Sequence, residues 1–426
     1  MSFKIRTTQD ADRAHRRGSG LLVVALSAAM CCAPVAADGP KKSTNGGAPS
    51  TKVTHYLRST PETTNLGGFI IDSPSVLDIK SGDVVRVDVI NQSGATSATV
   101  DPVTFFGAFG VAPGEVLPDA IDFWNSLPTK VRYGPHILTG PIYIEGAEPG
   151  DTIELQILDV YQRVPFGLNN TAPQGGVLST TYPGFRPGDV PLDIAPVPPG
   201  APAGVFPDVR QHLYRTAKVK GVDVALFSKD IHVPLRPFFG VMGVAPPTGQ
   251  FIGNTEDSPP PATGVQSSTQ PWNFGGNIDS HVLRKGTTVY FPVFQSGAQF
   301  FFGDTHSVQG DGEISGTALE HSLAGVFRFV LHKNTGQEWP WAENKDHYIL
   351  MGFHWDLDRA MRNASIETIK FLNQKMGLTD AKAFSLASIG VDYVNSEVVD
   401  RTQVVSAFIP KRYFLKRPAS VVGAPD

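Results

Sequence analysis

The chain has 426 residues and a formal net charge of −4, with 41% hydrophobic and 18% charged residues. This length is enough for a large buried core and for two or three subdomains. The acidic balance offers no basic surface for nucleic acid, so we expect no nucleic-acid partner. The 43 Gly and 35 Pro residues are typical of many short strands joined by turns, and they argue against a helical bundle.

The first 37 residues have the pattern of an export signal. Basic residues precede the apolar run Leu21–Met30, and small residues at Val35 and Ala37 predict cleavage after Ala37. The apolar run is too short to remain as a membrane span, so we expect no stable span and a periplasmic or secreted protein. The pair Arg16-Arg17 leaves twin-arginine export open beside general secretion. A lipoprotein would have to use one of the adjacent cysteines, but Ala29-Met30 before Cys31 is a poor lipobox.

Cysteine placement limits the chemistry of the mature chain. Cys31 and Cys32 both lie in the export signal, so the mature protein has no thiol and no disulfide. A nucleophilic cysteine is therefore excluded, and any metal site must use imidazole, carboxylate and amide groups. Residues 38–50 follow as a polar linker, which we expect to be disordered.

Residues 51–325 have the pattern of a β-rich core. The segment Val84–Ile90 alternates apolar and polar residues as a half-buried strand does. Similar turn–strand units begin at Thr152 and Thr287, which suggests barrel-like or sandwich β modules. A short helix is expected at 119–127. The stretches 162–215 and 247–271 are rich in Gly and Pro, and we expect them to be long loops over the surface or over a site.

Residues 326–426 have the pattern of a mixed segment, with strands followed by helices. Two strand patterns come first, at Val326–His332 and Tyr348–Phe353. Helical spacing of apolar residues follows over Leu357–Met376, with Gly377 placed to end that helix. Thr379 can cap a second helix that runs to about residue 389. The predicted fold class is therefore β-dominated α+β, with a smaller C-terminal α/β part.

The segment Gly303–Glu320 is the densest group of chemically active side chains. It contains the polar residues Asp304, His306, Gln309, Asp311, Glu313 and Glu320. In an extended strand Asp304 and His306 point to the same side, about 6.5–7 Å apart, and the nearby glycines allow the chain to bend so that both reach one ion. Imidazole with carboxylate suits Zn²⁺, with Mn²⁺ and Fe²⁺ as alternatives. Such an ion would lower the pKa of a bound water toward ~7, and a nearby carboxylate could move its proton.

A purely structural interpretation of this segment stays open. Asp and Gly are good turn residues, and Asp311-Gly312 is a hairpin signal. His136 is a candidate third ligand or a hydrogen-bonded structural residue. Asn277 and Asp279 either orient a ligand or form an Asx turn. A nucleophilic serine is not indicated, because the chain has no Gly-x-Ser-x-Gly elbow.

Several blocks of the sequence together resemble the acetamidase/formamidase family. The first is Gly303-Asp304-x-His306-x-x-Gln309-Gly310-Asp311-Gly312-Glu313. The others are Thr139–Ile142 with Gly146–Asp151, Pro237–Pro246, Gly275-Gly276-Asn277-x-Asp279 and Ser388–Asp392. They occur in order over about residues 52–410, so the resemblance covers nearly the whole mature chain. Linked blocks are more specific than any one of them.

The resemblance implies a β-rich, homo-oligomeric hydrolase that cleaves the carbon–nitrogen bond of a short linear amide, of the formamide or acetamide type, to carboxylate and ammonia. It implies a divalent metal, with zinc the first choice. Carried over by position, the expected metal ligands are Asp304, His306, His136 and Asp279. The expected proton relay is Glu313, beside Asp304 and His306 as catalytic residues, and Asn277 and Gln309 are expected to bind substrate.

Two features set this chain apart from the family pattern. The family is mostly cytoplasmic, whereas this sequence carries an export signal. The loops 162–215 and 247–271 are long and rich in Pro, so they can reshape the pocket for a larger amide or an ester. A further alternative is a secreted β-rich protein of the same fold that binds metal or another ligand without turnover.

Overall fold

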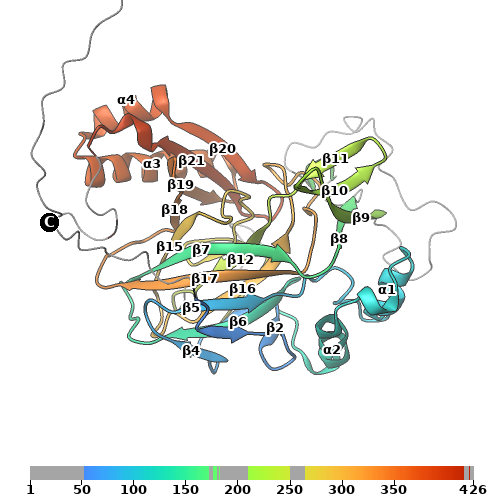
Figure 1. Cartoon of the computed structure of the whole chain (residues 1–426). Coiled ribbons are helices and arrows are strands. Elements are labelled where there is room, and N and C mark those ends of the chain that lie inside the picture. The colour runs from blue at the N-terminus through green and yellow to red at the C-terminus, as the bar shows by residue number, and fades with distance from the viewer. Residues whose placement is uncertain are drawn as a thin grey trace, which may run out of the picture. The chain divides into compact units, whose positions relative to one another are not determined.

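The structure is a computed structural model that describes residues 52–171, 176–179, 182, 210–249, 264–416 and 422. The predicted export signal and linker lie outside these residues. Residues Thr51–Asp426 form one compact unit. Within its described part the fold is β-dominated with a small helical part near the C-terminus, as the sequence predicted (Figure 1). No helix among the described residues is long and apolar enough to cross a membrane.

The largest sheet has nine strands and runs through both halves of the chain. In spatial order they are β1 (His55–Leu57), β5 (Val84–Asp88), β17 (Leu323–His332), β7 (Thr152–Gln162), β15 (Thr288–Pro292), β18 (Trp341–Glu343), β19 (His347–His354), β21 (Gln403–Pro410) and β20 (Asp392–Glu397). The three turn–strand units found in the sequence supply β5, β7 and β15, so they share this one sheet. The boundary expected at residues 325 and 326 falls inside β17, between β5 and β7.

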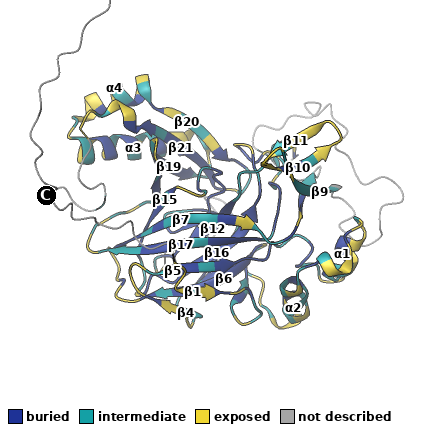
Figure 2. Cartoon of the chain, in the orientation of Figure 1, coloured by how far each residue is buried: buried dark blue, intermediate teal, exposed yellow. Residues whose placement is uncertain are grey.

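A second sheet packs against the first. It contains β14 (Gly275–Asn277), β12 (Phe238–Gly243), β16 (Phe300–His306), β6 (Ile137–Ile144) and β2 (Thr64–Leu66), with β4 (Leu77–Ile79) also paired to β6. Aromatic rings fill the space between the sheets: Phe302 lies 4.5 Å from Phe327 and Phe239 lies 5.0 Å from Phe327, measured between ring centroids. Such edge-to-face and tilted ring pairs add to the burial of apolar area. The two sheets therefore form a sandwich, with buried strands that Figure 2 shows in dark blue.

Two smaller sheets complete the β structure. One contains β11 (Ile231–Pro234), β10 (Val222–Ser228), β9 (Arg210–Val219) and β8 (Phe166–Thr171), and the other pairs β13 (Val265–Ser267) with β3 (Gly68–Ile70). Strands β8 and β9 lie inside the stretch 162–215 that we expected to be a loop, and β13 lies inside 247–271. Sequence inspection missed β8 because Gly167, Asn169 and Asn170 weaken its strand signal. Much of each expected loop lies outside the described residues.

The helices lie at the edges of the sandwich. Short helices α1 (Pro102–Gly107) and α2 (Pro118–Ser126) lie apart from the C-terminal pair α3 (Leu357–Met376) and α4 (Asp380–Gly390), which lies beside β19–β21 in Figure 1. Single 3₁₀ turns occur at Pro113–Glu115, Leu127–Thr129, Gly176–Leu178 and Lys411–Tyr413. Helix α3 begins after Asp356, which caps Arg359 N, and ends at Gly377 in the left-handed conformation, as predicted.

Candidate metal centre

Strand β16 carries the first two residues of the site. Asp304 and His306 are buried at the C-terminal end of this strand, and His306 Nε2 lies 3.3 Å from Asp304 Oδ1. The bend that brings them together is in Asp304 itself, whose φ is +44°. A residue with a side chain rarely adopts this left-handed conformation, which costs roughly 1–3 kcal/mol and persists only where surrounding structure enforces it.

Four further carboxylates converge on the same place. Glu320 Oε1 lies 3.2 Å from His306 Nε2, and Asp279 Oδ1 lies 3.4 Å from His306 Nδ1. Glu313 has a ligand oxygen within 4.8 Å of those of His306 and Glu320, and it also approaches Asp279 and Asp400 within that distance. We refer to the six residues as the carboxylate–histidine cluster; they are Asp279, Asp304, His306, Glu313, Glu320 and Asp400.

Backbone strain is concentrated in this cluster. Asp279 has a φ of +43° and Glu313 a φ of +45°, so they share the left-handed conformation of Asp304. Three strained carboxylate residues in one site indicate that their positions matter for function, because strain of this kind gathers at active sites and ligand sites.

The hydrogen bonds of Gln309 fix the tautomer of His306. Gln309 Nε2 donates to the Asp279 carbonyl at 2.6 Å, so its Oε1 is the acceptor that faces His306 Nδ1 at 3.1 Å. His306 therefore donates from Nδ1, and in the neutral ring its Nε2 carries the lone pair. That nitrogen faces the Asp304 and Glu320 carboxylates but makes no hydrogen bond with either.

Glu320 and Asp304 are oriented by amides. Gln92 Nε2 donates to Asp304 Oδ1 at 2.7 Å and to Glu320 Oε2 at 2.9 Å. Asn91 Nδ2 donates to Glu320 Oε2 at 2.8 Å. Partners of this kind hold metal-binding carboxylates in place in other proteins.

The remaining predicted residues lie around the cluster. His136 Nε2 is 3.4 Å from Asp304 Oδ2, while its Nδ1 pairs with the hydroxyl of Ser268 at 3.0 Å. It thus stands behind Asp304 and is not among the ligand groups that lie within 4.8 Å of one another. Asn277 Nδ2 donates to Asp400 Oδ2 at 2.7 Å, on the far side of Asp279. His136 and Asn277 therefore each contact a member of the cluster, whereas Asp311 lies beside His281 and is not among the candidate ligands.

Electrostatics show that the cluster has an excess of negative charge. Burial, together with the neighbouring carboxylates of Glu313 and Asp304, raises the pKa of Asp279 well above its usual value. Burial and Asp400 do the same to the pKa of Glu313. Burial opposes protonation of His306, but Glu320 and Asp304 raise its pKa well above the usual value. Asp304 alone has a lowered pKa, because His136 and His306 outweigh its burial.

The donor set fits a divalent cation. Both carboxylate oxygens of Asp279 are buried without a hydrogen-bond partner, as is His306 Nε2. Ligands at about 2.0–2.1 Å from a tetrahedral Zn²⁺ lie roughly 3.3 Å apart, and Nε2 of His306 lies 3.3 Å from Asp304 Oδ1 and 3.2 Å from Glu320 Oε1. Buried carboxylates without partners are costly unless a positive charge compensates them. The residues present therefore fit a bound metal ion.

Sequence reasoning missed four residues that build this site. Gln92 and Asn91 come from the segment after β5, and Asp400 follows β20. Gly240 of β12 leaves the space that Asp279 occupies. Their segments match no known metal-ligand spacing, so only the pairing of β12 with β16 and the path of the C-terminal part place them together.

A buried Ser–His pair beside the cluster is structural. Ser307 Oγ lies 2.7 Å from His321 Nδ1, and His321 Nε2 donates to the Val164 carbonyl at 2.7 Å. Burial lowers the pKa of His321 to about 4. Ser307 has no exposed surface, so no substrate reaches its hydroxyl.

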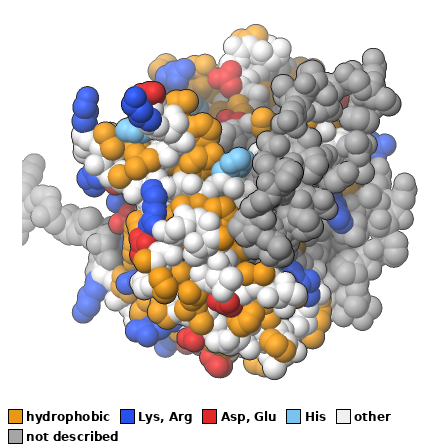
Figure 3. Space-filling model, turned by 90° about the vertical axis from the view of Figure 1, so that its right-hand side faces the viewer, with side chains coloured by type: hydrophobic (Ala, Val, Ile, Leu, Met, Phe, Trp, Pro, Cys, Tyr) orange, Lys and Arg blue, Asp and Glu red, His pale blue; other side chains and the backbone are white. Residues whose placement is uncertain are grey.

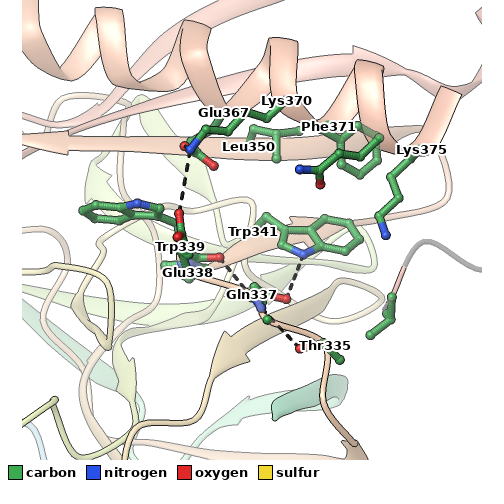
Figure 4. A pocket seen from close by; sticks show the side chains of 14 residues that line it. Thr335, Gln337, Glu338, Trp339, Trp341, Leu350, Glu367, Lys370, Phe371 and Lys375 are labelled. Carbon is green, nitrogen blue, oxygen red and sulfur yellow. Dashed lines mark hydrogen bonds and ion pairs between the residues drawn. The ribbon is translucent and has the colours of Figure 1, made fainter. Parts of the chain in front are cut away.

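A separate cavity of about 600 Å³ lies between α3 and the segment that contains β18 (Figure 4). Its acidic groups are paired, since Lys370 lies 2.8 Å from Glu367 and 3.8 Å from Glu338. Trp341 Nε1 donates to Gln337 Oε1 at 3.2 Å. No member of the carboxylate–histidine cluster lines this cavity, so it is not the metal centre.

The carboxylate–histidine cluster lies in a part of the chain that is similar to known proteins. Residues 249–416 match the acetamidase/formamidase family, and this range contains the whole cluster. The chain is 29% identical over 266 residues to a formamidase of Methylophilus methylotrophus and 26% identical over 213 residues to an acetamidase of Mycolicibacterium smegmatis. These matches cover 57% and 42% of this chain, and 58% and 49% of the relatives, so the chain spans only about half the length of each.

Solved structures extend the likeness over more of the chain. An acetamidase from Yersinia enterocolitica superposes with a TM-score of 0.65 and 26% identity, over 87% of this chain and 96% of that one. An acetamidase from Bacillus halodurans has a TM-score of 0.60 at 22% identity over 84% of this chain and 98% of that one, which shows the shared fold. Residues 249–416 therefore match the acetamidase/formamidase family, and the fold of the chain is similar to that of solved acetamidases.

Proposed function

We propose that this protein is a metal-dependent amidohydrolase that cleaves the carbon–nitrogen bond of a linear amide to give a carboxylate and ammonia. The observation that carries the proposal is the partner-free carboxylate of Asp279 beside His306, in a cluster of further carboxylates. The names of the relatives, formamidase and acetamidase, support the reaction class.

Asp279, Asp304 and His306 form one set that would hold the ion, and His306, Glu313 and Glu320 form a second, because the ligand atoms within each set lie within 4.8 Å of one another. We propose that the ion is zinc because the donors mix nitrogen and oxygen. When bound, a divalent ion polarises an amide carbonyl and lowers the pKa of a water molecule. Gln309 keeps the His306 lone pair directed at the ligand carboxylates. Gln92 holds Asp304 and Glu320 at a fixed separation.

Glu313 is the residue that we propose moves the proton. It approaches the ligand atoms of His306 and Glu320 on one side and those of Asp279 and Asp400 on the other. From that position its carboxylate can take a proton from the attacking water and deliver it to the leaving nitrogen, so that the carbon–nitrogen bond breaks as ammonia forms. Asn277 orients Asp400 beside it.

The test is ammonia release from formamide and acetamide by the full chain, with and without chelator. We expect chelation to abolish release and Zn²⁺ to restore it. His306→Ala should lower turnover by more than about 100-fold, because a lost ligand costs more than a lost orienting partner. Equal activity with and without metal would contradict the mechanism, and bound metal without ammonia release would favour the non-catalytic alternative.

We propose in addition that the enzyme is exported and works as a homo-oligomer. The support for export is the basic and apolar pattern of residues 1–37. N-terminal sequencing of the protein recovered from the periplasm or medium should begin at Asp38. Light scattering of the purified protein measures the assembly, and a monomer would contradict the second part.

A further inference from the structure

A pocket of about 320 Å³ opens beside the carboxylate–histidine cluster. It lies between the segment Val308–Leu319 and the strands β9, β10 and β11. Gln309 and Glu313 line it, and these are the residues that orient His306 and complete the cluster. The pocket is therefore directly connected to the groups that would carry the reaction.

The opposite wall of the pocket is apolar. Phe227 of β10 stacks on Tyr214 of β9, with ring centroids 4.9 Å apart, and Val233 of β11 lies beside them. Ile314 comes from the other side. Phe227 is 50% exposed and Ile314 is 64% exposed, so both present apolar surface to whatever enters. Hydrophobic side chains are also visible among charged groups on the face shown in Figure 3.

Hydrogen bonds fix this wall relative to the metal centre. Leu168 of β8 and Glu320 exchange two backbone hydrogen bonds, of 2.9 and 2.7 Å. Asn169 Nδ2 donates to the carbonyls of Thr317 and Ala318 at 3.0 Å. Because β8 pairs with β9, the apolar wall and the ligand Glu320 belong to one hydrogen-bonded framework.

The volume of the pocket exceeds what the smallest amides need. Sites for drug-sized ligands start at about 300 Å³, whereas formamide and acetamide have only a few non-hydrogen atoms. An apolar wall next to a polar reactive group is the usual arrangement for a ligand with one apolar and one polar end.

We propose that the substrate is a primary amide with a bulky apolar acyl group, of phenyl or branched alkyl size. That group lies against Phe227 and Ile314, while the amide points toward Glu313 and the metal centre. This inference rests on the proposed amide hydrolysis and assigns its substrate class. Water adds to the carbonyl carbon, the carbon–nitrogen bond breaks, and one proton goes to the leaving nitrogen, so the products are the apolar carboxylate and ammonia.

The experiment compares kcat/KM for acetamide, isobutyramide and phenylacetamide in the metal-loaded wild-type protein, Phe227→Ala and a control, Phe384→Ala. Phe384 is 62% exposed on α4 and outside the pocket. We expect wild-type protein to prefer phenylacetamide over acetamide by about 10-fold or more, the gain that added apolar groups bring in a hydrophobic pocket. Phe227→Ala should reduce that preference by about 10-fold, and Phe384→Ala should keep it.

The outcomes separate this inference from the proposed function. Turnover of acetamide with no gain for phenylacetamide overturns the apolar pocket and leaves amide hydrolysis standing. The inference is also overturned if Phe227→Ala keeps the preference for phenylacetamide but changes the oligomeric state of the protein. That result would assign the apolar surface to a contact between subunits. If no amide is hydrolysed, the proposed function fails, and calorimetry with phenylacetamide then tests the pocket by itself. Weaker binding by Phe227→Ala than by wild-type protein supports the apolar pocket, and equal binding overturns it.

Discussion

A Cβ atom on Gly240 would lie 2.0 Å from Oδ1 of Asp279. The contact joins β12 to the segment that follows β14, and the same Cβ would lie 3.1 Å from His306 Cε1. Glycine at this position thus keeps room for a carboxylate that has no other partner.

Gly240→Ala should displace Asp279 and weaken metal binding and turnover together. A 2.0 Å contact is far inside van der Waals distance, so Asp279 or the strand has to move. Metal content of the purified variant measures the effect, with circular dichroism to check the fold. Gly114→Ala is the control, because a Cβ there meets nothing within 4 Å. Full metal occupancy in Gly240→Ala would show that Asp279 is not a ligand.

Gln92→Ala should lower metal affinity by about 10- to 100-fold, the usual effect of removing a residue that orients ligands. Its amide holds Asp304 and Glu320 together, and the loss leaves two carboxylates free to separate. Competition with a chelator of known affinity measures the change. Gln374→Ala, on the exposed side of α3, is the matched control. An unchanged affinity would mean that the carboxylates are held by other contacts.

Arg236→Gln should reduce kcat more than it raises KM. Arg236 Nη2 donates to the Gln309 carbonyl at 2.9 Å, and Nη1 donates to His281 Nε2 at 3.1 Å. His281 Nδ1 in turn lies 3.0 Å from Asp311 Oδ1, so this chain of contacts holds the segment that carries Gln309. Steady-state kinetics on acetamide tests it, with the exposed Arg412→Gln as control. A rise in KM alone would indicate a role in substrate binding instead.

Asp151→Ala should destabilise the fold by about 1–3 kcal/mol, since it removes the hydrogen bonds that this buried carboxylate accepts, one of them from an ammonium group. Asp151 accepts from Lys333 Nζ at 2.5 Å and from the backbone amides of Asn334 and Glu148, each at 2.8 Å. Burial opposes ionisation, but these bonds outweigh it and hold the pKa of Asp151 below its usual value of 3.8. Urea unfolding measures the loss against Asp122→Ala, an exposed control on α2.

The same residue predicts a pH dependence of stability. A carboxylate whose pKa is depressed by folding stabilises the native state fully above its unfolded pKa, near 3.8, and the stabilisation is lost as pH falls through the lower folded pKa. The difference in free energy of unfolding between wild-type protein and Asp151→Ala should therefore be constant at neutral pH and shrink below about pH 4. A difference that grows in acid would contradict this assignment.

Sequence patterns predicted the parts of the fold that rest on local physics. The alternation in Val84–Ile90 and the caps at Gly377 and Thr379 act within a few residues, so their signals can be seen in the sequence. The pairing of β8 with β9 depends on partners forty residues apart, and weak strand formers such as Asn169 hide it.

The candidate site divides in the same way. Asp304, His306 and Glu313 lie close together in the segment Gly303–Glu320, so the sequence alone indicates them as candidate site residues. Gln92 and Asp400 could not be found, because the role of each comes from contacts with distant segments. The bend at Asp304 was also misplaced: we expected the glycines to supply it, whereas the strain lies in the acidic residue itself.

The cluster contains residues from both ends of the described chain, and this determines when during folding the site can form. Gln92 follows β5 near the start of the described chain, whereas Asp400 lies near its end, and both reach the same group of side chains. Contacts between residues so distant in sequence form late, because a long loop must close first. An unfinished chain during synthesis therefore lacks a complete ligand set. If the protein binds the ion that we propose, its acquisition would be a late step of maturation, and a bound ion would report that these distant segments have come together.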